Sequence, residues 1–244
     1  MFDFDFKKYD CVINLIGIAE QKSGNIYNYI HSDFPSKLSS MAKKAGTKLI
    51  HISAFAPFKS KNKYVVTKRT GEKYVLENNP DAVVLKPCLM LGAGGAFISD
   101  FEKMIKYLPI VPLIGFGGAK MKPVFASDVA KFIVEAVKQN LKGGSYTLSG
   151  SEVISSKNLI LKIMGFMNIK RSLLPIPPFV FKVLFFIKGF LPQFVFRTKV
   201  TSDIINMATF DVIPEKNDLT LLVPHPTKLD KGLSSILSKY KLYD

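Results

Sequence analysis

The chain has 244 residues, of which 48% are hydrophobic and 22% are charged, so it is predicted to be a packed globular protein and not a disordered one. Its formal net charge of +15 comes almost wholly from lysine, because Arg69, Arg171 and Arg197 are the only arginines. Base reading and forked phosphate contacts favour arginine, so the composition argues against nucleic acid and favours a basic surface that meets anionic lipid or an acidic partner.

The first predicted strand follows a short polar start. The opening "MFDFDFKKYD" lacks the apolar core of a signal peptide, so export is not expected. The run "YDCVINLIGIAE", which includes Gly17, is typical of a strand buried on both faces of a parallel sheet. Cys11 lies in this run and Cys88 in a later one, and both are interpreted as reduced core residues.

Helices and strands then alternate. Asp33, Pro35 and Gly46 bracket a helix from Phe34 to Ala45, and "KLIHIS" predicts a second buried strand from Lys48 to Ser53. A helix containing Tyr64 runs to the stop at Asn78, Asn79 and Pro80, and "AVVLKPCLML" is the third strand. This alternation predicts crossover connections and therefore an α/β fold with a Rossmann-like parallel sheet and flanking helices.

A glycine-rich turn, "GAGGAF" at Gly92 to Phe97, joins the third strand to the helix "FISDFEKMIKYL". It departs from the dinucleotide fingerprint G-x-G-x-x-G, because Phe97 stands where the third glycine belongs. It is interpreted as a loop on the active-site side of the sheet, with direct phosphate binding as the alternative.

The remaining elements are a short strand and a capped helix in "KPVFASDVAKFIVEAV", a strand in "SYTLSG" and a helix in "SSKNLILKIMGFM". From Lys170 the sequence becomes rich in proline, phenylalanine and lysine, which predicts a boundary between residues 1–169 and a small, mostly helical region at 170–244. Within it, residues 173–196 have apolar residues at helical spacing and are too short between Pro178 and Pro192 to span a bilayer. They either dock on a membrane surface or partner, or pack on the protein itself.

Tyr64 and Lys68 stand four residues apart on the predicted helix, which places them on one face. The spacing alone leaves two interpretations open, an acid/base pair or two neighbours on an ordinary helix. His31, His51 and His225 share no ligand spacing, so no metal site is predicted.

The order of the segments "DCVINLIG", "HIS", "YVVTKRTGE", "VVLKP", "PVFASDVAKFI" and "YTLSG" resembles the extended, atypical short-chain dehydrogenase/reductase superfamily. With "TSDIINMATFDVIPEKNDLTLL" added, the chain is most similar to the branch that holds the reductase-like accessory subunit of respiratory complex I and its bacterial relatives. The resemblance implies respiratory complex I subunits as partners, NAD(P) as the cofactor and a cytoplasmic or matrix-side place, peripheral on the inner membrane.

The resemblance also implies roles for individual residues. Tyr64 would be the general acid/base, and Lys68 would lower its pKa and hold the nicotinamide ribose. Ser53 is the nearest hydroxyl that could orient the substrate oxygen, although the family's more usual serine position holds Ala54. The remaining cofactor contacts are assigned to Gly17, Leu91 and Gly92.

The phosphate-binding glycines of this fold follow its first strand, in a half that precedes the strand "VINLIG". Since nine residues precede Asp10, the chain is expected to begin in mid-domain, without the glycine fingerprint, and to bind NAD(P) poorly. The sequence therefore predicts a non-catalytic or vestigial relative that supports assembly or stability of respiratory NADH:quinone oxidoreductase. The alternatives are an NAD(P)-dependent reductase, epimerase or dehydratase, and a membrane-surface interaction module.

Overall fold

The computed structural model describes residues 5–18, 26–56, 63–177, 180 and 210–238. Contacts divide the chain into two compact units that are interleaved in sequence. The first unit is Met1–Cys88, Asp128–Ser149 and Pro214–His225, and the second is Leu89–Ser127, Gly150–Ile213 and Pro226–Asp244. The sequence predicts a boundary near Lys170, because the composition changes there. The contacts instead group residues 128–149 and 214–225 with the first 88 residues of the chain.

The first unit is built on a parallel sheet in the order β1-β2-β3-β8. Its strands are β1 (Cys11–Asn14), β2 (Lys48–Ile52), β3 (Val83–Pro87) and β8 (Gly144–Leu148). Each neighbouring pair runs parallel, as in Ile50 opposite Val83. The predicted α/β class with a parallel sheet is confirmed.

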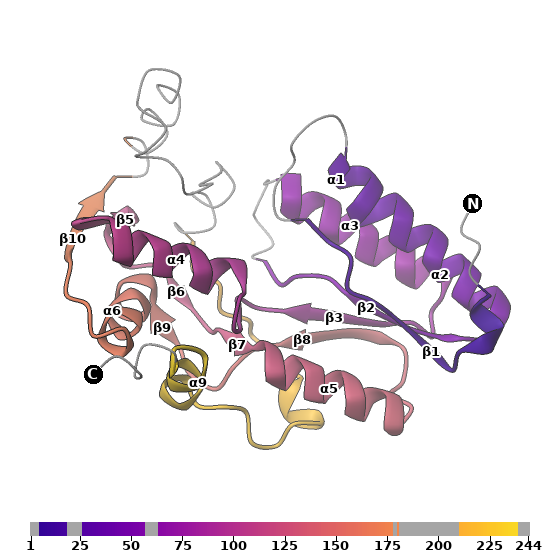
Figure 1. Ribbon diagram of the computed structural model, residues 1–244. Coiled ribbons are helices and arrows are strands. Elements are labelled where there is room, and N and C mark those ends of the chain that lie inside the picture. Colours follow the sequence, from indigo (N-terminus) through magenta and orange to yellow (C-terminus); the bar gives the residue numbers. More distant parts are fainter. Residues whose placement is uncertain (1–4, 19–25, 57–62, 178–179, 181–209, 239–244) are drawn as a thin grey trace. The chain divides into compact units, whose positions relative to one another are not determined.

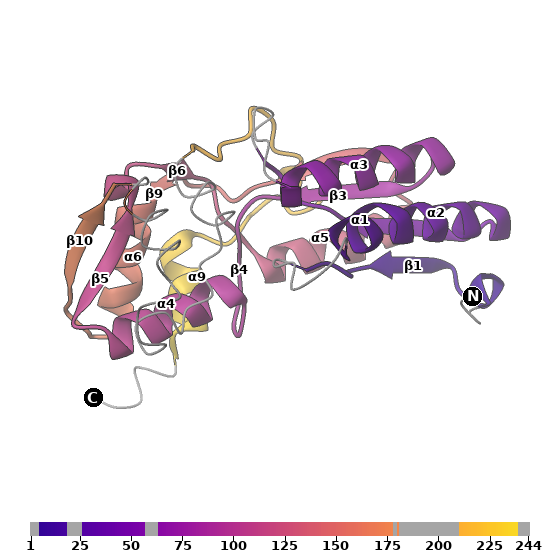
Figure 2. The ribbon, with the colours of Figure 1, turned by 90° about the horizontal axis from the view of Figure 1, so that it is seen from above.

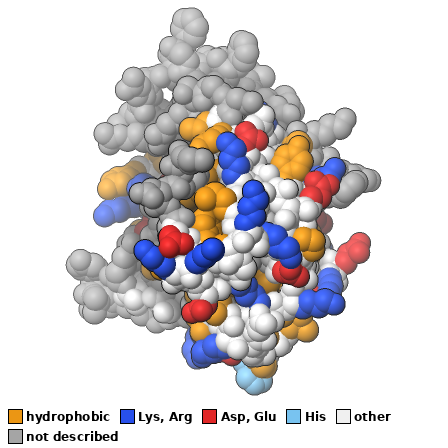
Figure 3. All heavy atoms as spheres, turned by 90° about the vertical axis from the view of Figure 1, so that its right-hand side faces the viewer, with side chains coloured by type: hydrophobic (Ala, Val, Ile, Leu, Met, Phe, Trp, Pro, Cys, Tyr) orange, Lys and Arg blue, Asp and Glu red, His pale blue; other side chains and the backbone are white. Residues whose placement is uncertain are grey.

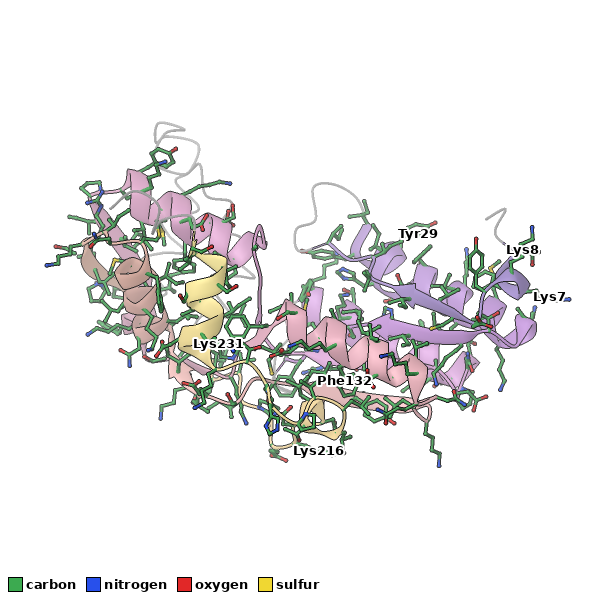
Figure 4. The ribbon with its side chains drawn as sticks, turned by 60° about the horizontal axis from the view of Figure 1, so that its bottom comes forward. Lys7, Lys8, Tyr29, Phe132, Lys216 and Lys231 are labelled. Atoms are coloured by element: carbon green, nitrogen blue, oxygen red, sulfur yellow. The ribbon has the colours of Figure 1, made fainter. Side chains whose placement is uncertain are left out.

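Helices cover both faces of this sheet (Figure 1). Helices α2 (Phe34–Ala45) and α3 (Lys63–Asn78) lie on one face, where Ala42, Leu49 and Val75 belong to one buried cluster. Helix α5 (Ala126–Lys138) lies on the other face, and its buried Phe132, labelled in Figure 4, has its ring centroid 6.3 Å from that of Tyr146 on β8. These layers bury the central strands β2 and β3 between them.

Strand β1 differs from its prediction. The apolar run predicts a strand buried on both faces, but in the described part of the chain β1 pairs with β2 alone and lies at the edge of the sheet. As a result Ile13 is 43% exposed, and Leu15, just after the strand, is 68% exposed. An apolar edge of this kind favours association with other chains.

Short elements complete the first unit. They are η1 (Phe6–Lys8), α1 (Ile26–Asn28), the π-helical turn η2 (Tyr29–Asp33) and η5 (Leu219–Leu221). Two reciprocal hydrogen bonds join the segment that contains η5 to β8. Asp218 N–H donates to the Thr147 carbonyl at 2.7 Å, and Thr147 N–H donates to Asp218 Oδ2 at 2.9 Å. These two bonds hold residues 214–225 against the first unit.

The second unit packs helices against short strand pairs around one apolar core, which contains Leu91, Ile105, Leu159 and Leu233 (Figure 2). Its elements are β4 (Met90–Leu91), α4 (Ala96–Tyr107), β5 (Ile110–Ile114), η3 (Gly115–Gly117), β6 (Lys120–Met121), β7 (Val124–Phe125), β9 (Ile154–Ser155), α6 (Ser156–Phe166), β10 (Ser172–Ile176) and α9 (Leu229–Ile236). Strand β5 pairs with β10 and β4 with β7, both in parallel, and β6 pairs antiparallel with β9.

The described part of the region after residue 169 supplies the strand β10 as well as η5 and α9, and the mostly helical character of residues 170–244 stays a prediction. Most of the predicted docking segment 173–196 lies outside the described residues. Within the described ranges, no helix has both the length and the apolar character needed to cross a bilayer. Figure 3 shows Lys and Arg side chains dispersed over one face and mixed with hydrophobic ones, without forming a single basic patch there.

Candidate functional site

The candidate site lies in the first unit, where α3 meets the carboxyl ends of β1 and β2. Lys68 is 5% exposed, and its Nζ donates to the carbonyl of Ile52, the last residue of β2, at 3.3 Å. The same Nζ lies 3.1 Å from the place that a Cβ on Gly17 would occupy. The absence of a side chain at Gly17 therefore leaves room for the ammonium group beside the segment that follows β1.

The ammonium of Lys68 is held in a desolvated place. Burial lowers the pKa of Lys68 to about 8, against the effect of the Glu72 carboxylate, which raises it. Glu72 stands one helical turn after Lys68, and burial raises the pKa of its own carboxyl, while a hydrogen bond from Ser53 opposes that shift. The Glu72 carboxylate, which the predicted pair did not include, thus acts on Lys68 electrostatically.

Tyr64 is packed among aromatic rings. Its ring centroid lies 5.3 Å from that of His31, with the rings perpendicular, and 6.2 Å from that of Tyr27. Burial raises the pKa of Tyr64, and the neighbouring Tyr27 phenol raises it further. The resemblance implies a pKa lowered by Lys68, whereas the shift here is upward and desolvation is its main cause. The catalytic role of Tyr64 stays a prediction.

The hydroxyl of Ser53 is hydrogen-bonded to the carboxylate of Glu72. Ser53 is buried, and its Oγ donates to Glu72 Oε1 at 2.5 Å. A hydroxyl has one proton to donate, so in this arrangement that proton points to the Glu72 carboxylate and not to a substrate oxygen. Glu72 was missed by the sequence reasoning, although its spacing of four from Lys68 on the same helix face could have indicated it.

Two buried histidines, His31 and His51, are close enough to Lys68 for its charge to contribute to the pKa of each. Ile18 N–H donates to His31 Nε2 at 3.3 Å, which leaves the proton on Nδ1 to be donated to Thr67 Oγ1 at 3.0 Å. Burial, with a further contribution from Lys68, lowers the pKa of His31 to about 4. The sequence analysis considered His31 and His51 only as metal ligands, so it did not predict their place near Lys68.

His51 is fully buried on β2. Its Nδ1 accepts from Asn14 Nδ2 at 3.0 Å, because the amide oxygen of Asn14 is already bonded to Ile16 N–H. Burial, and then Lys68 and His31, lower the pKa of His51 to about 3. Its Nε2–H has no hydrogen-bond partner among the described residues.

The predicted cofactor residues fall in different units. Gly17 and Lys68 come together in the first unit, as described above. Leu91 is buried at the end of β4 in the second unit, and a Cβ on Gly92 would lie 3.1 Å from the Cβ of Ala126. A cofactor contact at Leu91 or Gly92 stays a prediction.

Comparison with solved structures identifies the class of fold. UDP-glucuronic acid 4-epimerase from Bacillus cereus, solved in complex with NAD, matches 99% of this chain and 79% of its own length with a TM-score of 0.68 at 18% identity. The chain therefore has the Rossmann-like fold of the extended reductases and epimerases, as predicted. No family model matches the chain.

Comparison with curated proteins gives a more particular similarity. The mitochondrial NADH dehydrogenase [ubiquinone] 1 alpha subcomplex subunit 9 of Mus musculus is 28% identical over 237 residues, which cover 95% of this chain. The Arabidopsis thaliana protein of the same name is 30% identical over 157 residues, or 62% of this chain. The chain spans 62% of the length of the mouse protein and 39% of the plant one. The predicted resemblance to the complex I accessory subunit is confirmed.

Proposed function

We propose that this chain is a non-catalytic protein of NAD(P)-binding fold that associates with respiratory NADH:quinone oxidoreductase and supports its assembly or stability. The observation that carries the proposal is the similarity of 95% of the chain to a named subunit of the mitochondrial enzyme, and the packing of Tyr64 against the rings of His31 and Tyr27 supports it. The hydrogen bond from Ser53 to Glu72 supports the proposal further, because it occupies the hydroxyl that would orient a substrate oxygen. The relatives are named as subunits of the mitochondrial enzyme. We therefore propose that the partners of this chain are subunits of that enzyme, and that it lies peripherally at the inner membrane or at the corresponding bacterial membrane.

A second candidate function, an NAD(P)-dependent reductase or epimerase, is favoured by the position of Lys68. Its ammonium lies at the carboxyl ends of the strands, which is where ligands bind in open parallel sheets. In that case Tyr64 and Lys68 would act together on the substrate.

Replacing Tyr64 by phenylalanine distinguishes the two functions. The variant keeps the ring that contacts His31 and Tyr27 and loses only the hydroxyl. An accessory role predicts that native gels of host membranes show unchanged amounts of assembled NADH:quinone oxidoreductase when Tyr64→Phe replaces the wild type in a deletion strain. A reductase or epimerase would lose about 10²- to 10⁴-fold in activity with the acid/base removed. Loss of chain function in Tyr64→Phe with unchanged protein level would contradict the accessory role.

We further propose that the 244-residue chain, expressed by itself, does not bind NADH or NADPH at micromolar concentration. The support is the turn "GAGGAF", which departs from the fingerprint at Phe97. Each charge-assisted bond missing from a pyrophosphate site weakens binding by about 1.5–3 kcal/mol, or about tenfold or more. Calorimetric titration with both nucleotides is the measurement. A dissociation constant in the low micromolar range would show that another site holds the phosphates, and the resemblance would then extend to cofactor binding.

A further inference from the structure

The strands β5 and β10 of the second unit form a parallel ribbon with two different faces. Figures 1 and 2 both show the strands side by side, and Ile110 pairs with Ser172 and Ile114 with Ile176 in register. Side chains alternate between the faces of a strand. Of the inward set, Val111, Leu113 and Leu173 belong to or pack on the apolar core of the unit, whereas Pro175, which pairs with Leu113, is exposed at the edge. The outward set is therefore Ile110, Pro112, Ile114, Ser172, Leu174 and Ile176.

The outward face of this ribbon is apolar. Five of its six positions carry aliphatic or proline side chains, with Ser172 as the exception, and Ile110 is 48% exposed and Leu174 51% exposed. Parallel strands are normally covered on both faces, so an apolar outward face without cover is unusual. An exposed apolar surface bordered by polar residues marks an interaction site.

Cations and an aromatic ring border the ribbon where the strands begin. Lys170 and Arg171 precede β10, and Lys106 lies with its Nζ 5.8 Å from the ring centroid of Tyr107 at the end of α4. A shallow hollow of about 580 Å³ opens at this border and is lined by Tyr107, Leu108, Pro109, Lys170, Arg171 and Ser172. This lining is cationic, with two hydroxyl groups and no carboxylate.

Arg171 is oriented by the fold. Its Nε–H donates to the Ile105 carbonyl at 3.1 Å and its Nη1–H to the Lys170 carbonyl at 3.2 Å, which places the guanidinium at the end of α4. A guanidinium has five N–H donors, so the fixed group can still offer donors to the hollow. Asp100 and Glu102 also lie on α4, although neither lines the hollow.

We propose that the outward face of the β5–β10 ribbon docks on an anionic membrane surface, with a lipid headgroup phosphate in the hollow beside Lys170 and Arg171. The combination of exposed aliphatic side chains, a tyrosine at the border and cations is what an interfacial surface presents to acyl chains and anionic headgroups. A second copy of the chain fits less well, because its cationic border would face a border of the same sign and its charge is +15 overall. The proposal does not depend on the proposed function.

Flotation of the full chain with vesicles tests this docking. The probes are phosphatidylcholine vesicles with and without about one-third phosphatidylglycerol, at low and high salt. Wild type is expected to float with the anionic vesicles at low salt, and to do so less at high salt, where surface charges are screened. Lys170→Gln is expected to weaken binding about fivefold, the effect of one cation near the surface. Ile110→Gln with Leu174→Gln is expected to weaken it at least tenfold.

Matched controls lie in the first unit. Lys44→Gln removes an exposed lysine from α2, and Val134→Gln removes a half-exposed aliphatic side chain from α5. Both are expected to bind as wild type does, and thermal melting checks that every variant is folded. No flotation of the wild type, equal flotation on both vesicle types, or control variants as weak as the ribbon variants would overturn the proposal. Binding that survives the ribbon changes but is lost in Phe186→Ser with Phe190→Ser would overturn it too, because it would assign docking to the later segment.

Discussion

Replacing Gly71 by alanine is expected to destabilise the first unit by about 2 kcal/mol or more. Gly71 lies in α3 against the π-helical turn η2, and a Cβ there would lie within 1.7 Å of the His31 carbonyl oxygen and 2.9 Å of its carbonyl carbon. Because the obstacle is backbone, α3 and η2 would have to move apart. Overpacking of this kind costs about 1–3 kcal/mol or more, which outweighs the gain of about 1 kcal/mol for alanine over glycine in a helix.

The movement would also strain the bonds that join the two elements, such as Ser32 Oγ to the Thr67 carbonyl at 2.9 Å and His31 Nδ1 to Thr67 Oγ1 at 3.0 Å. Urea unfolding at neutral pH measures the change. Gly165→Ala is the matched control, because Gly165 is also helical, is exposed and has nothing within 4 Å of its Cβ position. It should gain up to about 1 kcal/mol. Two variants of equal stability would contradict the close approach of α3 to η2.

Local signals account for the parts of the fold that the sequence predicts well. Helix α2 has the predicted bounds, Phe34–Ala45, because Pro35 favours its first turn and Gly46 ends it with a φ of 71°. Strand β2 and helix α3 are also close to prediction for the same reason. In these segments the determinants lie within a few residues of each element's ends.

The parts that the sequence does not predict depend on distant contacts. The turn η2 adopts its π-helical form against Gly71, a neighbour that no local pattern identifies. Strand β10 forms because Ser172–Ile176 pairs with β5, although its composition indicates a change of domain. Residues 214–225 return to β8 through Asp218, which interleaves the two units.

The candidate site also has one property that the sequence predicts and one that it does not. The spacing of Tyr64 and Lys68 follows from the helical repeat, so their common face could be predicted. The chemical state of each could not, because it depends on groups from other elements: Tyr27 and His31 beside Tyr64, and Ile52 and Gly17 beside Lys68. Burial by those groups decides the direction of both pKa shifts.

Lowering the pH from 7 to 5 is expected to cost the first unit about 3 kcal/mol of stability. Both buried histidines have folded pKa values below the ordinary value of 6.5, at about 4 for His31 and about 3 for His51. Between those values and 6.5 the unfolded chain binds more protons than the folded one, so stability falls as the pH falls through this window. Each imidazole contributes about 1–2 kcal/mol at pH 5. Glu72, whose pKa burial raises, acts in the opposite direction by taking up a proton in the folded state, which offsets part of the loss near the lower end.

The change in unfolding free energy between pH 7 and pH 5, measured by urea titration, tests this expectation independently of the absolute stability of each variant. His31→Gln with His51→Gln removes both titrating groups, so its pH dependence should be smaller than that of the wild type by about 3 kcal/mol, even if the variant is less stable at both pH values. His225→Gln is the control, because His225 is exposed and is the remaining histidine of the chain. If the double variant loses as much stability on acidification as the wild type, then the imidazoles of His31 and His51 are not held neutral by burial, and the environment assigned to Lys68 between them is wrong.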